Sequence, residues 1–259
     1  MILFHCDLDN TLIYSYKHEI KTKKRCVEIY QGREVSFMTE ATCRLLNKVK
    51  NKVSIVPTTT RTVEQYQRID LGIGTLDYAL MCNGGVLFLH GKEDATWYEE
   101  TKALIAESRA ELLYGEKLLE KDKNRCFEVR NIRDLFLFTK SNNPAASAAY
   151  FRKYLDTEKA EVFCNGIKVY IVPRQLNKGS ALLRLKKRLG AELVIAAGDS
   201  GFDIPMLNQA DFALAPAELK REAGLLESVI YVEEGKLFSE MLLKKILDFT
   251  KEKVKITDK

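Results

Sequence analysis

The stretch Phe4-His-Cys-Asp-Leu-Asp-Asn-Thr-Leu12 decides the fold that we expect for this chain. An apolar run predicts a buried strand, which ends in two carboxylates, Asp7 and Asp9, and the loop-forming residues Asn10 and Thr11. Alternate side chains of an extended chain point to the same side, so the two carboxylates repel each other there. A hard divalent cation such as Mg2+ relieves that repulsion best, although acidic strand-to-helix loops also occur without a metal.

The composition is that of an ordinary globular protein, with 259 residues, 46% of them hydrophobic and 30% charged. The net charge of +5 is spread along the chain, so a nucleic-acid partner is not favoured, although a basic run at residues 17–25 could attract an anionic substrate. Six cysteines without C-x-x-C pairing lie mostly in apolar runs, which indicates reduced, buried thiols in a cytoplasmic protein. Because no stretch approaches ~18 consecutive apolar residues and no charged leader precedes the first strand, we expect neither membrane insertion nor export.

Strands and helices alternate in the first part of the chain. Thr39 is expected to cap a helix that leads to a strand at residues 53–57, and a second helix at residues 63–69 leads to a strand at residues 78–81. Two short strands around Gln31-Gly32 predict a small flap beside the first loop. The alternation predicts a parallel sheet with right-handed crossovers.

The pattern changes between residues 86 and 173, where hairpins and helices mix. The expected elements are an amphipathic stretch at residues 96–120, strands at 125–129 and 135–139, a helix that begins at Asn143-Pro144, and a hairpin around Asn165-Gly166. This mixture predicts an α+β insert with an antiparallel sheet. We interpret residues 85–173 as a cap domain inserted into a core formed by residues 1–84 and 174–259.

The parallel pattern resumes after residue 173. A helix at residues 177–189 leads to a wholly apolar strand at residues 193–197, which is typical of a strand covered on both faces. That strand breaks into Gly198-Asp-Ser-Gly-Phe-Asp203, and two short strands and a closing helix follow. The fold class predicted for the core is therefore α/β, with a Rossmann-like, doubly wound parallel sheet.

Four polar clusters fall where ligands bind in such a sheet, outside the carboxyl ends of the strands. They supply carboxylates, hydroxyls and a cation, which are the groups that a metal-assisted phosphoryl transfer needs. A carboxylate that attacks phosphorus would form a covalent acyl phosphate and divide one difficult displacement into two easier ones. The clusters are Asp7 with Asp9, residues 58–61, Lys178, and Asp199 with Ser200 and Asp203.

The same residues resemble, in order, the four signature motifs of the haloacid dehalogenase (HAD) superfamily of phosphatases. The large insert after the third strand resembles type IIB of that superfamily, which contains Cof-type sugar phosphatases, sucrose-phosphate phosphatase, mannosyl-3-phosphoglycerate phosphatase and phosphomannomutase. The resemblance covers nearly the whole chain and implies a HAD core with an inserted C2-type cap. It rests on Asp7-Leu-Asp9-Asn-Thr-Leu, Thr59-Thr-Arg61, Lys178-Gly and Gly198-Asp199-Ser-Gly-Phe-Asp203.

The resemblance implies a role for each matching residue. Asp7 would be the nucleophile, and Asp9 the general acid and base that protonates the leaving alcohol and then activates water. Lys178 would neutralise phosphate charge. Asp199 would bind Mg2+ together with Asp7 and the carbonyl of Asp9, and Asp203 would ligate the metal, hold a metal-bound water, or simply cap the following helix.

Further residues carry roles that leave alternatives open. Thr59 and the backbone N–H that follows it would hold phosphate oxygens, with Thr58 or Thr60 as alternative registers. Arg61 would steer the substrate, pair with a cap carboxylate or form a structural ion pair. Ser200 is a candidate substrate contact.

Two positions depart from the family pattern. Many relatives carry Asn where this chain has Phe202, and Asn10 stands where Gly is common. The first change removes an amide that could support phosphate or a metal-bound water. Specificity is expected in the insert, near residues 83–85, 125–133 and 165–170.

The sequence thus predicts a Mg2+-dependent phosphomonoester hydrolase that acts on a small phosphorylated metabolite, a sugar phosphate above all. A sugar phosphomutase would use the same phosphorylated Asp7 but hand the phosphoryl group to a sugar hydroxyl. A catalytically idle module that keeps the fold is a third hypothesis, which the retained Asp7, Asp9, Lys178 and Asp199 disfavour. A nucleic-acid binder ranks last.

Overall fold

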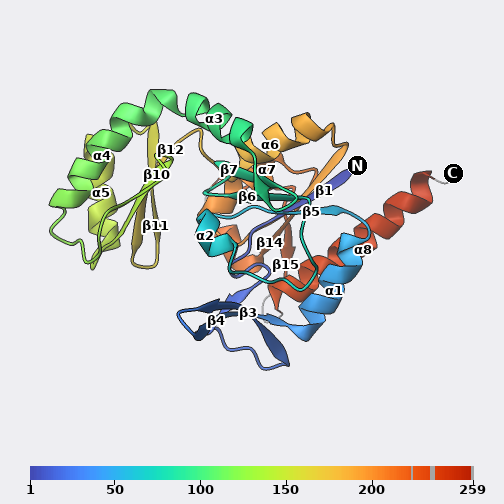
Figure 1. The fold of residues 1–259 in the computed structure, drawn as a ribbon. Coiled ribbons are helices and arrows are strands. Elements are labelled where there is room, and N and C mark those ends of the chain that lie inside the picture. The colour runs from blue at the N-terminus through green and yellow to red at the C-terminus, as the bar shows by residue number, and fades with distance from the viewer. Residues whose placement is uncertain (223, 234–236, 258–259) are drawn as a thin grey trace. The chain divides into compact units, whose positions relative to one another are not determined.

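The computed structural model in Figure 1 describes residues 1–222, 224–233 and 237–257 of the chain. The chain divides into two compact units, of which the first comprises Met1–Asp94 and Lys178–Lys259 and the second comprises Ala95–Asn177. The sequence places the insert at residues 85–173, whereas by their contacts residues 85–94 belong to the first unit and residues 174–177 to the second.

Five parallel strands form the centre of the first unit. Their order is β15-β14-β13-β1-β5, so β1 lies between β13 and β5 and pairs with both. The predicted Rossmann-like parallel sheet is therefore confirmed. The bounds are β1 (Ile2–Cys6), β5 (Ser54–Pro57), β13 (Leu193–Ala197), β14 (Phe212–Pro216) and β15 (Ile230–Val232).

The strand predicted at residues 78–81 forms, as β6 (Tyr78–Met81), but it pairs differently from the expectation. It is the first strand of a small antiparallel sheet with β7 (Val86–Leu89) and β8 (Lys92–Glu93). A parallel bridge between Thr58 and Leu80 connects it to the central sheet. The tight turn through Cys82 and Asn83, both at positive φ, reverses the chain directly after β6.

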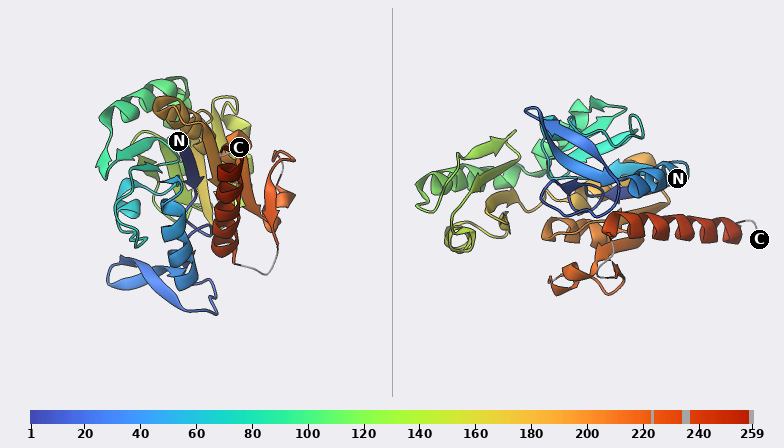
Figure 2. Two further views of the ribbon diagram at one scale, coloured as in Figure 1. Left: turned by 90° about the vertical axis from the view of Figure 1, so that its right-hand side faces the viewer. Right: turned by 90° about the horizontal axis from the view of Figure 1, so that it is seen from below.

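Helices flank the central sheet. Figures 1 and 2 show α1 (Glu40–Lys50) and α8 (Phe238–Thr257) side by side, and their apolar residues share one core with Phe4 of β1 and Ile195 of β13. The predicted cap of α1 is confirmed, because the backbone N–H of Thr42 donates to Oγ1 of Thr39 over 3.0 Å. A second helix pair, α6 (Lys178–Leu189) and α7 (Ile204–Gln209), packs together beside β13 and β14. Between β5 and β6, α2 (Val63–Tyr66) is shorter than predicted.

The predicted flap is a three-stranded antiparallel sheet of β2 (Tyr14–Ser15), β3 (Lys24–Tyr30) and β4 (Arg33–Thr39). Its turn lies at Gln31 and Gly32, with φ of 49° and 72°. The pairing of β3 with β4 shifts register on both sides of Glu28. The side chain of Glu28 is 3% exposed, so a charged residue of the flap is buried.

The second unit is an antiparallel sheet with helices on one face. The strand order is β11-β12-β10-β9, and residues of α4 and α5 share a core with Leu137 of β10 and Ile171 of β12. The predicted cap of α5 at Asn143 and the hairpin at residues 165–166 are confirmed. The elements are α3 (Ala95–Leu104), η1 (Ala106–Ser108), α4 (Arg109–Lys121), β9 (Arg130–Ile132), β10 (Phe136–Lys140), α5 (Pro144–Tyr154), β11 (Ala160–Asn165) and β12 (Lys168–Pro173).

Two details of this unit go beyond the local sequence pattern. The amphipathic stretch at residues 96–120 forms two helices, because it breaks near the buried Ile105 into α3, a short 3-10 turn and α4. The strand expected at residues 125–129 forms instead at β9, and Arg125 makes an isolated bridge with Ser141. Both differences follow from tertiary contacts that local periodicity does not encode.

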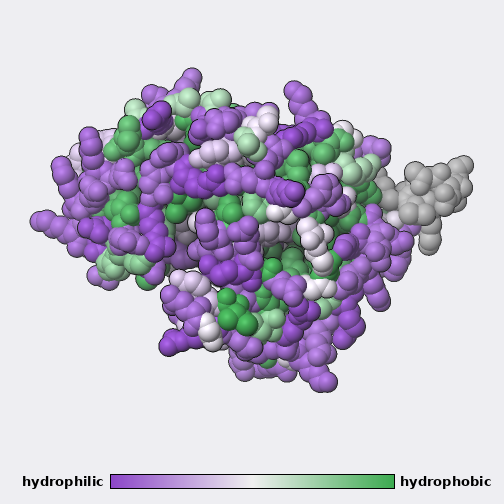
Figure 3. Space-filling model, viewed as in Figure 1, coloured by the Kyte–Doolittle hydropathy of each residue, from purple (hydrophilic) through white to green (hydrophobic). Residues whose placement is uncertain are grey.

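The face of the molecule in Figure 3 is mostly hydrophilic, with hydrophobic residues in small groups between charged ones. No helix within the described residues is long and apolar enough to cross a membrane. All six cysteines are thiols, but Cys126 and Cys164 are exposed, contrary to the expectation that they are buried.

A close approach between α6 and α7 supplies a first testable prediction. A Cβ added at Gly179 would lie 2.3 Å from the carbonyl oxygen of Pro205, so Gly179→Ala is expected to lower the free energy of unfolding by about 1–3 kcal/mol. Urea unfolding checks this. Gly201→Ala is the matched control, because the added Cβ meets no atom within 4 Å, and its expected change is within about 0.5 kcal/mol. Equal stability of the two variants would contradict the close packing.

Candidate active site

The two carboxylates of the first loop lie directly beyond β1. The backbone N–H of Asp7 donates to the carbonyl of Ala197 over 2.9 Å, which continues the pairing of β1 with β13. Asn10, at a φ of 56°, then turns the chain back, and the carbonyl of Leu8 accepts from the N–H groups of residues 11–13. Asp7 is 6% exposed, whereas the side chain of Asp9 is 47% exposed. The buried carboxylate thus faces the sheet edge and the other is accessible to solvent.

Lys178 lies at the centre of the site although it is at the first position of α6. Its side chain is 1% exposed, and its Nζ donates to Oδ1 of Asp7 over 2.7 Å and to Oδ1 of Asp203 over 2.6 Å. Burial alone lowers the pKa of Lys178, but the charges of Asp203 and Asp7 more than offset it, so the net pKa is raised. The side chain is therefore a fixed cation between two carboxylates.

The loop after β13 brings in two further carboxylates. Oδ2 of Asp203 accepts from the backbone N–H groups of Asp199 and Ser200 and from the hydroxyl of Ser200 over 3.1, 3.0 and 2.8 Å. A Cβ at Gly198 would lie 2.4 Å from the side chain of Asp203, so only glycine fits there without a shift. Asp203 thus fixes the loop that presents Asp199, and the hydrogen bonds of Ser200 tie it into the same turn.

The arrangement of acids fits a divalent metal. Oxygen atoms of Asp7, Asp199 and Asp203 lie within 4.8 Å of one another, and carboxylate oxygens are the ligands that Mg2+ prefers. Burial raises the pKa of Asp7 well above its usual range despite the charge of Lys178, and burial together with the charge of Asp203 raises the pKa of Asp199 to about 7. When they are ionised, three close carboxylates carry more negative charge than one lysine can balance, and a bound divalent cation would balance the rest.

The acids differ in how many of their oxygens the protein already engages. Both oxygens of Asp203 accept hydrogen bonds, from Lys178 on one side and from the Ser200 turn on the other. Asp199 accepts from Oγ1 of Thr11 over 3.3 Å. Asp7 and Asp199 therefore suit direct metal ligation better than Asp203, which suits an indirect role. The carboxylate of Asp9 lies outside the group of three that could share an ion.

The threonines after β5 are oriented by hydrogen bonds that differ from one to the next. Oγ1 of Thr58 is directed inward, within 2.9 Å of Nδ1 of His5. Oγ1 of Thr59 accepts from the N–H of Arg61 over 3.2 Å, and its own N–H donates to the carbonyl of Leu80. Thr60 is partly exposed. These contacts make Thr58 the least suited of the three to hold a phosphate.

Arg61 makes a two-point contact with Asp9. Its Nε and Nη2 donate to the two oxygens of Asp9 over 2.7 and 2.8 Å, and its Nη1 donates to Oε2 of Glu28 over 2.9 Å. Arg68 donates to the other oxygen of Glu28. Sequence reasoning missed Glu28 and Arg68, because only the placement of the flap beside the first loop pointed toward them.

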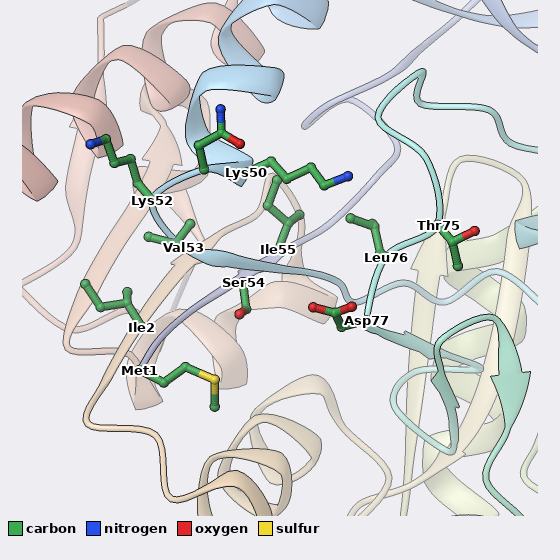
Figure 4. A pocket seen from close by; sticks show the side chains of 11 residues that line it. Met1, Ile2, Lys50, Lys52, Val53, Ser54, Ile55, Thr75, Leu76 and Asp77 are labelled. Carbon is green, nitrogen blue, oxygen red and sulfur yellow. The ribbon is translucent and has the colours of Figure 1, made fainter.

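Two pockets lie at opposite edges of the central sheet, and only one of them borders the acidic cluster. One of about 310 Å3 opens beside Asn10 and Asp199, next to the acidic cluster. The pocket in Figure 4, of about 320 Å3, is lined in part by Met1, by Ile2 at the start of β1 and by residues 53–55. These residues lie at the amino ends of β1 and β5, at the opposite sheet edge from Asp7. The position expected to carry an amide, Phe202, is a buried side chain.

His5, on β1 below the site, makes acid stability testable. Burial lowers its pKa from 6.5 to about 3, and its Nε2 has no hydrogen-bond partner among the described residues. The unfolded chain binds a proton on this histidine below pH 6.5, whereas the native state binds it only near pH 3. Between these two values the free energy of unfolding therefore decreases by about 1.4 kcal/mol for each unit by which the pH is lowered. From pH 6 to pH 4, His5→Asn is expected to lose about 2–3 kcal/mol less than the wild type in urea unfolding. Parallel curves would contradict the buried, neutral imidazole.

Comparison with known proteins places the chain in a family. The family model described as haloacid dehalogenase-like hydrolase matches residues 83–223. A phosphoglycolate phosphatase of Sulfurisphaera tokodaii is 27% identical over 172 residues, 64% of this chain and 67% of that protein. A phosphoglycolate phosphatase of Methanopyrus kandleri is 28% identical over 174 residues, which cover 64% and 70% of the two chains.

Solved structures show the same fold over nearly the whole length. The sucrose-phosphatase of a Synechocystis species, in complex with sucrose and phosphate, has a TM-score of 0.65 at 18% identity and covers 96% of this chain and 97% of its own. A sugar phosphatase of HAD subclass IIB has a TM-score of 0.63 at 15% identity, with coverage of 96% and 99%. The fold expected from the sequence is confirmed, and the chain belongs to the haloacid dehalogenase-like hydrolases.

Proposed function

We propose that this protein is a Mg2+-dependent phosphomonoester hydrolase that acts through an aspartyl phosphate on Asp7. The observation that carries the proposal is the position of Lys178, whose buried ammonium bridges Asp7 and Asp203 beside Asp199. It supports the proposal because the carboxylate of Asp7, a buried cation and the oxygens of two further carboxylates lie around one point. Such an arrangement stabilises charge on the equatorial oxygens of a transferring phosphoryl group.

In the first step an oxygen of Asp7 attacks phosphorus, and the bond from phosphorus to the ester oxygen breaks. The leaving oxygen takes a proton from the carboxylic acid of Asp9, which lies two residues on and is accessible to solvent. Lys178 holds the attacking carboxylate in place. Asp7 and Asp199, with the help of Asp203, would hold a Mg2+ ion, which would act as a Lewis acid and offset the negative charge of the site.

In the second step the carboxylate of Asp9 takes a proton from water while the water oxygen attacks phosphorus. The acyl–phosphate bond breaks, inorganic phosphate leaves, and the carboxylate of Asp7 is restored. Thr59 and Thr60, at the end of β5, are the candidates to hold the phosphate oxygens in both steps. Ser200 is retained as a candidate contact to the substrate.

We propose a sugar phosphate as the substrate and the inserted unit as the cap that recognises its sugar. Phe163, Tyr170, Phe138 and Arg130 form one register row across β11, β12, β10 and β9. Alternation places this row on the face opposite the core that packs on α4 and α5. A row of aromatic side chains suits a sugar ring, whereas phosphoglycolate, which is named as the substrate of two relatives, suggests a small carboxylated ester as the second candidate.

A phosphatase panel tests the proposal. Sugar phosphates and phosphoglycolate are incubated with the protein and MgCl2, and released phosphate is measured, with an excess of EDTA as the matched control. Mg2+-dependent release without any sugar bisphosphate supports the hydrolase. Transfer to a sugar hydroxyl that requires a bisphosphate would favour the mutase, and no turnover on the whole panel would favour the idle module.

The reduced cysteines support a cytoplasmic location for the same enzyme.

A further inference from the structure

Glu28 is a buried anion with three partners. It lies on β3 of the flap at a register shift, and its side chain is 3% exposed. Its Oε2 accepts from the hydroxyl of Ser36 over 2.7 Å and from Nη1 of Arg61 over 2.9 Å. Its Oε1 accepts from Nε and Nη2 of Arg68 over 3.2 and 3.0 Å. The flap thus contributes one buried carboxylate whose two oxygens both accept hydrogen bonds.

These partners keep the side chain of Glu28 ionised. Burial on its own raises the pKa of Glu28, but the hydrogen bond from Ser36 and the charge of Arg61 more than offset it, so the net pKa is lowered. Glu28 is therefore an anion at neutral pH, and buried carboxylates of this kind are retained where they are paired.

Arg61 connects this anion to the first loop. A guanidinium group is a rigid, planar fork, so fixing one of its nitrogens fixes the direction of the others. With Nη1 held by Glu28, Nε and Nη2 both point at the carboxylate of Asp9, one to each oxygen. The side chain of Arg61 is 13% exposed, whereas that of Asp9 is 47% exposed. The buried Arg61 therefore orients the more exposed carboxyl group of Asp9.

We propose that Glu28 is a positioning residue for the proton transfer to the leaving group, because it holds Arg61 in the orientation that aims Asp9. The inference rests on the proposed function, since it requires that Asp9 is the acid. Without Glu28 the fork of Arg61 loses its anchor, and the carboxyl group of Asp9 loses its fixed direction. Nucleophilic attack by Asp7 depends on Lys178 and is left in place.

This role has a chemical signature that a structural role lacks. A poor leaving group, such as the alkoxide of a sugar, needs the proton from Asp9 as its bond to phosphorus breaks. A good leaving group such as 4-nitrophenolate departs without it. The ratio of kcat/KM for the two classes of ester reports the first step and isolates the acid, because loss of folded protein lowers both values equally.

The test measures kcat/KM of the wild type and of Glu28→Gln on 4-nitrophenyl phosphate and on the sugar phosphate that the wild type hydrolyses best. We expect the value for the sugar phosphate to fall at least about 10-fold and the value for 4-nitrophenyl phosphate to change less than about threefold. Asp70→Asn is the matched control, because Asp70 pairs with Arg25 of the same strand β3 but is exposed, and both of its values are expected to stay within about twofold. Ser36→Ala, which removes one hydrogen bond to Glu28, is expected to shift the ratio in the same direction by a smaller factor.

The outcomes separate the two proposals. An equal fall on both esters, or no change on either, would reject the positioning role of Glu28 while leaving the hydrolase assignment intact. A wild type that hydrolyses neither ester in the presence of Mg2+ would reject the proposed function itself. If Glu28→Gln does not fold, as judged by circular dichroism, the ratio measured for Ser36→Ala decides, and an unchanged ratio there rejects the role.

Discussion

Asp7→Asn is expected to reduce kcat by at least about 10^4-fold and to leave the fold intact. An amide oxygen is too weak a nucleophile to attack phosphorus, so no phosphorylated enzyme forms. The amide still offers an oxygen to the ammonium of Lys178, and therefore the packing at the end of β1 is kept. Phosphate release and mass spectrometry of the intact protein, quenched during turnover, measure the two consequences.

The same substitution is expected to stabilise the protein when Mg2+ is absent. The pKa of Asp7 is raised, first by burial and then by the neighbouring acids Asp203 and Asp199, which means that its charged form is disfavoured in the native state. A neutral amide removes this cost at pH 7, so the free energy of unfolding in EDTA rises. Asp248→Asn, at an exposed position, is the control and is expected to alter neither kcat nor stability. Near-normal turnover of Asp7→Asn would show that another group attacks phosphorus.

Lys178→Met is expected to lower the free energy of unfolding by about 3–5 kcal/mol at pH 7 and to abolish turnover. The apolar side chain leaves Asp7 and Asp203 facing each other without their shared cation. Because the pKa of Lys178 is raised, its contribution is present at neutral pH and is lost only at alkaline pH. Urea unfolding at pH 7, in EDTA and in MgCl2, measures the effect.

Lys186→Met is the matched control for that experiment. Lys186 lies on the same helix and pairs with Asp211, but both side chains are 30% or more exposed, so the expected loss is below about 1 kcal/mol. If a divalent cation binds these acids, MgCl2 should restore more stability to Lys178→Met than to the wild type. Similar losses for the two lysine variants would contradict the central position of Lys178.

Local chemistry predicted much of this molecule. Thr39 and Asn143 cap helices because their side chains meet the orphan N–H groups wherever a helix starts, and the wholly apolar strand at residues 193–197 is buried because it has no polar face. The edge rule for parallel sheets likewise anticipates that Asp7, Lys178 and Asp199 converge, since each follows or precedes a core element.

Other features depend on contacts between distant residues and have no local signal. Glu28 reaches Arg61 because a register shift in the flap turns its side chain inward. The strand at residues 78–81 pairs with its own hairpin partner because the turn at Cys82 reverses the chain at once. The stretch at residues 96–120 looks continuous by period, yet it bends at Ile105. Each of these is decided by tertiary packing.

The central position of β1 has a consequence for how the chain matures. The strand β13, which pairs with β1, and the site residues Lys178 and Asp199 are synthesised only after the whole inserted unit, at roughly 5–20 residues per second. Until then the newly synthesised β1 shows an open edge of unpaired peptide groups, which is a hazard for association with other nascent chains. The central sheet and the contact between Asp7 and Lys178 are therefore completed late in synthesis, so an incomplete chain that ends before residue 178 carries Asp7 but not the lysine that contacts it.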